Sequence, residues 1–191
     1  MAMKTLLIFY VLLGVVSTSF SQAKIFTVAE IHQLEIENSL HAQALIDWKV
    51  GDSQDYKVKM GFGLPGSLQK KATKEEGNGI WIYQEMKLGP VKDISELLVD
   101  RNTGQVLKFI HNGKEEKVPD TQIEVISIKN ESIEVPAGKF KVMHITAKSK
   151  QAKQIEMWVN NREIALDGAA KVYLDQGLIK VTMELTKFLK Q

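Results

Sequence analysis

The sequence predicts a mainly β (α+β) protein built on one strongly curved antiparallel meander sheet, an open half-barrel with an N-terminal helix against its concave side. Three observations predict this class. Short runs of alternating apolar and polar residues fill positions 47–191, turn-forming Gly, Asn, Asp and Pro residues separate these runs, and an amphipathic stretch precedes them. Helical segments do not alternate with the strands, which excludes a doubly wound α/β fold.

Residues 1–23 have the layout of a cleaved secretory signal peptide. Lys4 is the only charge, an apolar run of about eleven residues follows, and small and polar residues lead to Ala23. Ser21 and Ala23 stand at the minus-three and minus-one positions, so we expect cleavage after Ala23. The apolar run is shorter than the roughly 20 residues that cross a bilayer, so we expect no stable transmembrane span after cleavage. An uncleaved, tilted anchor is the alternative.

Composition predicts one globular domain over residues 24–191, with 44% hydrophobic residues and 25% charged residues. The formal net charge is only +2 and no large cluster of Lys and Arg is present, so nucleic acid is not expected as a partner. The chain contains no cysteine. An exported domain without disulfides suits the bacterial periplasm, with secretion as the alternative location.

Residues 24–46 are predicted to form the helical segment. Thr27 and Glu30 have the spacing of a capping box, in which a hydroxyl and a carboxylate satisfy free backbone donors. Ile31 and Leu34 belong to an imperfect apolar stripe of helical period, which would let the segment lie against a sheet.

The first strands are predicted from alternation within the β domain, residues 47–191. Residues 56–62 place apolar side chains on one face and lysines on the other. Residues 67–76 are polar and weakly patterned, which indicates an edge strand protected by lysines. Residues 80–88 carry Trp81 on one face and an apolar set on the other, so both faces of this strand are expected to be covered.

Turn residues predict the later hairpins. Positive φ angles suit Gly and Asn, so residues 101–104, 112–113 and 135–138 are read as turns. Residues 123–135 are long enough for two short strands or one bent strand. Alternation over residues 179–186 predicts the last strand, which brings the expected total to about nine to eleven.

Three short motifs stand in the C-terminal half: Val-Pro-Ala-Gly-Lys-Phe at 135–140, Trp158 in the middle of a strand, and Ile-Ala-Leu-Asp-Gly-Ala-Ala-Lys at 164–171. They resemble a broad set of bacterial exported proteins of unknown function that share a V-P-A-G-x-F turn. Ala165 replaces the proline usual in the third motif. Such proteins look like distant relatives of the periplasmic lipoprotein carriers, and this resemblance implies an open half-barrel and, by analogy, lipid carriage.

Catalytic and metal-binding patterns are missing from the sequence. Cysteine is absent, no G-x-S-x-G nucleophile motif occurs, and His32 and His41 stand nine residues apart, too far to share one helix face. His111 and His144 lie in separate predicted strands and would meet only through the fold. We therefore expect no enzyme activity, no catalytic residues, no metal site and no cofactor.

The remaining functional signal is a set of adaptable apolar side chains, since methionine and aromatic residues fit irregular ligands. The candidate ligand-binding residues are Met60, Phe62, Trp81, Met86, Met157 and Trp158. They predict a non-enzymatic periplasmic protein that binds an apolar or amphipathic ligand, either a lipid or an acylated partner, in the concave face of its sheet. The alternative is a structural or adaptor protein of the cell envelope that binds a protein partner without a small-molecule ligand.

The predicted cleavage can be tested by exporting the full chain from a bacterium and measuring the intact mass of the product. The expected mass is that of residues 24–191, because Ala23 satisfies the minus-one position. A product that keeps the leader would contradict this prediction.

Overall fold

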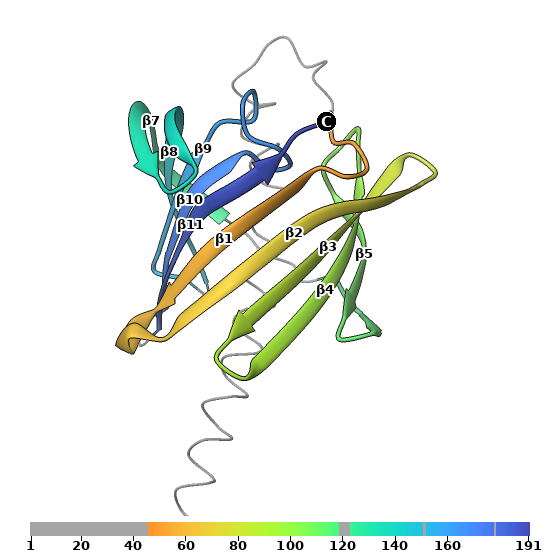
Figure 1. Ribbon diagram of the computed structural model, residues 1–191, viewed down its shortest axis with the longest axis horizontal. Helices are drawn as coiled ribbons and strands as arrows, with labels where there is room; N and C mark the ends of the chain where they lie inside the picture. The colour runs from red at the N-terminus through yellow and green to blue at the C-terminus, as the bar shows by residue number, and fades with distance from the viewer. Residues whose placement is uncertain (1–45, 119–122, 151, 178) are drawn as a thin grey trace, which may run out of the picture.

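The computed structural model describes residues 46–118, 123–150, 152–177 and 179–191 (Figure 1). This part of the chain forms eleven strands that pair into one antiparallel sheet, in the order β6-β5-β4-β3-β2-β1-β11-β10-β9-β8-β7. A single 3-10 turn, η1 (Gly61–Gly63), joins the first two strands. The strands are β1 (Ser53–Met60), β2 (Pro65–Glu76), β3 (Gly79–Leu88), β4 (Val91–Asp100), β5 (Val106–His111), β6 (Lys114–Glu116), β7 (Ile123–Val135), β8 (Gly138–Ser149), β9 (Gln154–Val159), β10 (Ala169–Asp175) and β11 (Lys180–Leu189).

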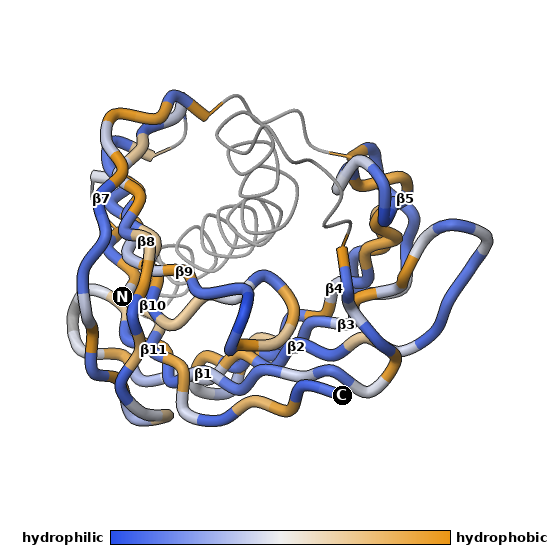
Figure 2. The backbone as a smooth tube through the Cα atoms, turned by 90° about the horizontal axis from the view of Figure 1, so that it is seen from above, coloured by the Kyte–Doolittle hydropathy of each residue, from blue (hydrophilic) through white to orange (hydrophobic). Residues whose placement is uncertain are grey.

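The sheet is open, because β6 and β7 form its two ends and are not paired with each other in the described residues. Figure 2 shows the sheet curling into a trough, with β7 and β5 on facing walls. The prediction of a mainly β, antiparallel, open sheet is confirmed, and eleven strands fall within the predicted number. The predicted leader (1–23) and helical segment (24–46) lie outside the described residues, apart from Ile46.

Alternation gives the sheet two chemically different faces. In β1, Tyr56 and Val58 are buried whereas Lys57 and Lys59 are exposed. Side chains that stand directly opposite each other on paired strands share a face, so the strand register extends this division across the sheet. We call the face that carries Tyr56 the inner face, because it lines the trough, and the opposite one the outer face.

The loop that joins β9 to β10, residues 160–168, covers part of the inner face. Its residues Ile164 and Ala165 are fully buried. Three side chains hold the loop and the start of β10 by hydrogen bonds to backbone carbonyl groups. These bonds run from Trp48 Nε1 to Leu166 O, from Gln54 Nε2 to Ala165 O and from Tyr56 Oη to Ala169 O, each 2.8 Å long.

One strand lies elsewhere in the sheet than predicted. The sequence predicts an edge strand over residues 67–76, but β2 pairs with β1 on one side and β3 on the other. The prediction is wrong because the polar character of this segment belongs mainly to its outer face, where Gln69 and Lys71 are exposed. Lys70 points inward and is buried beside a carboxylate, so a charge that suggests an edge lies within the sheet interior.

The predicted turns and the long later strand agree with the structure. Asn112 (φ 48°) and Gly113 (φ 79°) have the positive angles expected of the turn between β5 and β6. Residues 123–135 form one strand, β7, whose register shifts between Val125 and Ser127. The single-strand alternative is therefore the one observed, with its irregularity at residues 125–127 rather than around Asn130, where a bend was predicted.

The outer face of β3 and β4 contains a small network of charged and phenolic groups. The Tyr83 hydroxyl donates to Glu85 Oε2 at 2.7 Å, and the ammonium groups of Lys87 and Lys92 lie 2.8 and 2.7 Å from the same carboxylate. Hydrogen bonds from Lys87, Lys92 and Tyr83 lower the pKa of Glu85 to about 2. The bond to Glu85, with some desolvation, raises the pKa of Tyr83 to about 12.

We predict that Tyr83 ionises near pH 12 rather than at its ordinary value of 10.0. Because the folded state holds this phenol neutral, the stability it contributes is present below pH 10 and lost as the pH rises through about 12. The measurement is tyrosinate absorbance against pH, with Tyr83→Phe used to isolate the signal and circular dichroism used to confirm folding. In Glu85→Gln the transition should move down toward the ordinary value. An ordinary titration of Tyr83 in the folded wild type would contradict the prediction.

Candidate functional site

A row of buried polar side chains crosses the inner face. Gln54 pairs with Lys70, Lys70 with Gln84, and Gln84 with Ser95, so the four residues stand side by side on β1, β2, β3 and β4. At most 2% of each residue is exposed. We call these four residues the polar row. Buried polar groups in this number are costly unless they find partners, so their contacts indicate what the row does.

Apolar side chains lie on both sides of the polar row. On β3, Gln84 stands between Ile82 and Met86, which are 1% and 2% exposed. Met86 belongs to the larger buried cluster of the inner face and Ile82 to the smaller one. The row is therefore a polar band between two apolar regions.

The loop between β9 and β10 supplies partners to the first half of the row, although Gln54 Oε1 has none among the described residues. The ammonium group of Lys70 forms an ion pair and hydrogen bond with Asp167, and both side chains are almost completely buried. Lys70 Nζ also lies 5.2 Å from the centre of the Tyr56 ring. Burial, with the nearby negative charge of Asp167, raises the pKa of Tyr56 well above its ordinary value. Gln54 Nε2 donates to Ala165 in the same loop.

The second half of the row makes no hydrogen bond to this loop. The amide oxygen and nitrogen of Gln84 and the hydroxyl of Ser95 have no hydrogen-bond partner among the described residues. Both residues are 0% exposed. Exchanging the oxygen and nitrogen of the Gln84 amide does not change this, because both atoms lack a partner. Leaving such groups unpaired typically costs about 1–3 kcal/mol each. Buried donor and acceptor atoms without partners therefore lie between the two apolar regions of the inner face.

The structure divides the predicted ligand-binding residues between the two faces. Met60, Met86 and Met157 lie on the inner face, where Met86 and Met157 are buried and Met60 is partly buried. The side chain of Phe62 is outside the described part. Trp81 and Trp158 stand on the outer face, because each alternates with inward-facing neighbours in its strand.

Both tryptophans are covered by polar side chains on the outer face. Trp81 Nε1 donates to Glu76 Oε2 at 2.9 Å. Trp158 Nε1 donates to Glu131 Oε1 at 2.6 Å, and the ring of His144 stacks on Trp158 with 4.2 Å between centroids. The bond from Trp158 is the main reason why the pKa of Glu131 is lowered. These contacts give the tryptophans structural roles away from the inner face.

The histidines in strands do not meet. His111 Nε2 lies 2.6 Å from Asp93 Oδ1 on the β4–β5 side of the sheet. His144 lies on β8, near the other end of the strand order, with its ring nitrogens 3.1 and 3.5 Å from oxygens of Glu131 and Glu156. Among the residues that the structure describes, no group of three or more His, Cys, Asp and Glu side chains could hold a metal ion.

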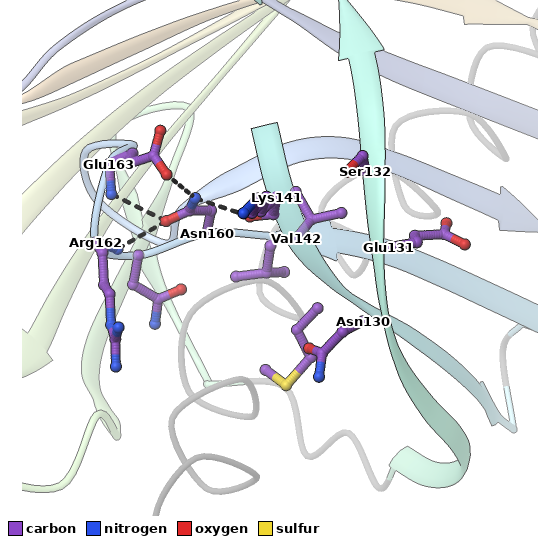
Figure 3. Close-up of a pocket in the computed structure, with 11 residues that line it drawn as sticks. Asn130, Glu131, Ser132, Lys141, Val142, Asn160, Arg162 and Glu163 are labelled. Atoms are coloured by element: carbon purple, nitrogen blue, oxygen red, sulfur yellow. Dashed lines mark hydrogen bonds between the residues drawn. The ribbon is translucent and has the colours of Figure 1, made fainter. Parts of the chain in front are cut away.

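A pocket of about 670 Å³ lies between the β7–β8 hairpin and the start of the loop after β9 (Figure 3). Asn160 uses its own side chain to shape this loop. Its Nδ2 donates to Lys141 O and Glu163 Oε1, and its Oδ1 accepts from the backbone of residues 162 and 163. Figure 3 shows Glu131 pointing away from the side chains of the loop. The residues that line the pocket include both basic and acidic side chains, so their charge does not indicate one class of ligand.

Comparison with known proteins adds no relative, because no family model and no curated protein matches the chain. Within the described ranges, no helix has both the length and the apolar character needed to span a membrane.

Sequence reasoning did not find the polar row. The available signal was a polar residue in phase with apolar neighbours, as in Ile82, Gln84 and Met86 of β3. Similar polar interruptions of an apolar face occur at Lys70 and Ser95. Only the strand register shows that both of these residues stand beside Gln84.

We predict that Lys70 and Asp167 contribute to the free energy of unfolding as a strongly coupled pair. Lys70→Met alone should lower the free energy of unfolding by about 3–5 kcal/mol, because it leaves a buried carboxylate without its cation. The double variant Lys70→Met/Asp167→Leu should lose clearly less than the sum of the two single variants. Urea denaturation of all four proteins measures the coupling. Additive losses would contradict the prediction.

Proposed function

We propose that this protein binds an apolar or amphipathic ligand, a lipid or an acylated partner, on the inner face of its curved sheet. It acts in the periplasm after removal of residues 1–23, and it acts as a binding protein rather than an enzyme. The observation that carries the proposal is the unpartnered half of the polar row, Gln84 and Ser95, between two apolar clusters.

The chemistry of this surface matches an amphipathic molecule. An apolar chain would pack on the aliphatic and methionine side chains that flank the row, and a polar group of the same molecule would bond to Gln84 and Ser95. A protein that needed this region only as a core would be more stable with apolar residues at both positions, since unpaired buried polar groups oppose folding. A ligand that supplies the missing hydrogen bonds accounts for their presence.

A second candidate function is docking of an envelope protein along β7. This strand ends the sheet, and Ile126 and Ile128 are 57% and 39% exposed there. An extended segment of a partner could add to this edge by backbone hydrogen bonds. The register shift in β7 and the exposed Lys129 oppose such pairing, which makes this the weaker candidate.

The test compares two isosteric variants of the polar row. In ligand-free protein, Gln84→Met should raise the free energy of unfolding by about 1–3 kcal/mol, because it removes two unpaired buried atoms. Gln54→Met should not give this gain, because it removes the hydrogen bond from Gln54 Nε2 to the Ala165 carbonyl together with the one unpaired atom, Gln54 Oε1. The measurement is urea denaturation after extraction of bound material and refolding.

The same variants then test binding. A total lipid extract of a bacterial envelope should raise the unfolding midpoint of the wild type, because a ligand of the folded state stabilises it. The rise should be smaller in Gln84→Met and unchanged in Tyr83→Phe, whose substitution lies on the outer face. An extract that leaves the wild-type midpoint where it was would contradict the proposed function.

A further inference from the structure

We infer that the ligand group bound beside Gln84 is an uncharged amide, such as the linkage of an N-acylated molecule, rather than a carboxylate, a phosphate or an ammonium group. This inference rests on the proposed function and specifies the class of ligand at the same site. It follows from the charges around the row and from the hydrogen-bonding capacity of its unpartnered atoms.

The charges on the inner face oppose an ionic ligand group from both sides. On β2, Lys70 is the residue opposite Gln84, and its ammonium group is already paired with Asp167. On β4, Asp93 lies two residues from Ser95 on the same face and accepts a hydrogen bond from Asn112 Nδ2 at 3.1 Å. His111, opposite Ser95 on β5, has its Nε2 2.6 Å from Asp93.

An ionic ligand group would therefore be buried without a counter-ion of its own. For an anion, the cation of this region, Lys70, is already paired with Asp167. For a cation, the carboxylate of Asp93 already accepts from Asn112 and lies 2.6 Å from His111 Nε2. A buried charge without its own counter-ion is strongly disfavoured, so a neutral group is the one that this position accepts.

To pair all of these atoms, the ligand group must contain both a hydrogen-bond donor and a hydrogen-bond acceptor. The Gln84 amide offers an oxygen that accepts and a nitrogen that donates, and Ser95 adds one hydroxyl donor and acceptor. A trans secondary amide carries one N–H and one C=O on opposite sides, so its N–H can donate to the Gln84 oxygen while its C=O accepts from the Ser95 hydroxyl. An ester has no donor and would leave the Gln84 oxygen unpaired.

The experiment uses three probes with the same long alkyl chain: an N-methyl alkanamide, the methyl ester and the alkanoate anion. Calorimetric titration of ligand-free mature protein at neutral pH measures the dissociation constant of each. The amide should bind about tenfold more tightly than the ester, the factor for one further satisfied buried hydrogen bond. The alkanoate should bind most weakly.

Two variants assign the preference to the polar row. In Gln84→Met the ratio of the amide and ester affinities should fall to about one, because no side-chain atom there can use the N–H. Tyr83→Phe, the neighbouring position on the outer face, should keep the wild-type ratio. A variant Gln84→Met that retains the full preference would overturn the assignment.

The outcomes separate this inference from the proposed function. Equal binding of the three probes, or tighter binding of the alkanoate, would overturn the inference and leave ligand binding on the inner face in place. Failure of all three probes to bind would also overturn the inference, and the lipid-extract test would then decide independently whether the proposed function holds.

Discussion

The buried ion pair between Lys70 and Asp167 is the contact on which the interior of this protein depends. A lysine in the middle of a sheet is tolerated only if a carboxylate reaches it, and Asp167 does so from the loop between β9 and β10. The same loop lies over β1 and the residues before it, and the side chains of Trp48 and Gln54 hold its carbonyl groups. The position of the loop and the burial of Lys70 therefore depend on each other.

The polar row has hydrogen-bond partners only as far as this loop extends. Gln54 Nε2 and Lys70 Nζ are bonded to the loop, whereas Gln54 Oε1, Gln84 and Ser95 have no partner in the described part of the chain. The division follows the edge of the loop rather than the chemistry of the side chains. Half of the row thus acts as a structural anchor, and the other half is where we place recognition.

Alternation and turn chemistry predicted most of the fold, because both are local. The strand over residues 80–88 and the turn at 112–113 follow directly from their residue types. The edge assignment of residues 67–76 failed because a buried lysine and a protective surface lysine look alike in sequence. Trp81 and Trp158 were predicted to bind the ligand because of their residue type. The sheet face on which each side chain lies depends instead on its position in the alternation of the strand.

The central claim is that an amphipathic ligand completes the inner face beside Gln84. The most direct measurement is mass spectrometry, under native and denaturing conditions, of protein exported into a bacterial periplasm and purified without detergent. We expect a stoichiometric adduct of lipid size that is lost on denaturation and is missing from Gln84→Met. A native mass equal to that of the polypeptide alone would contradict the claim and direct attention to a protein partner at β7.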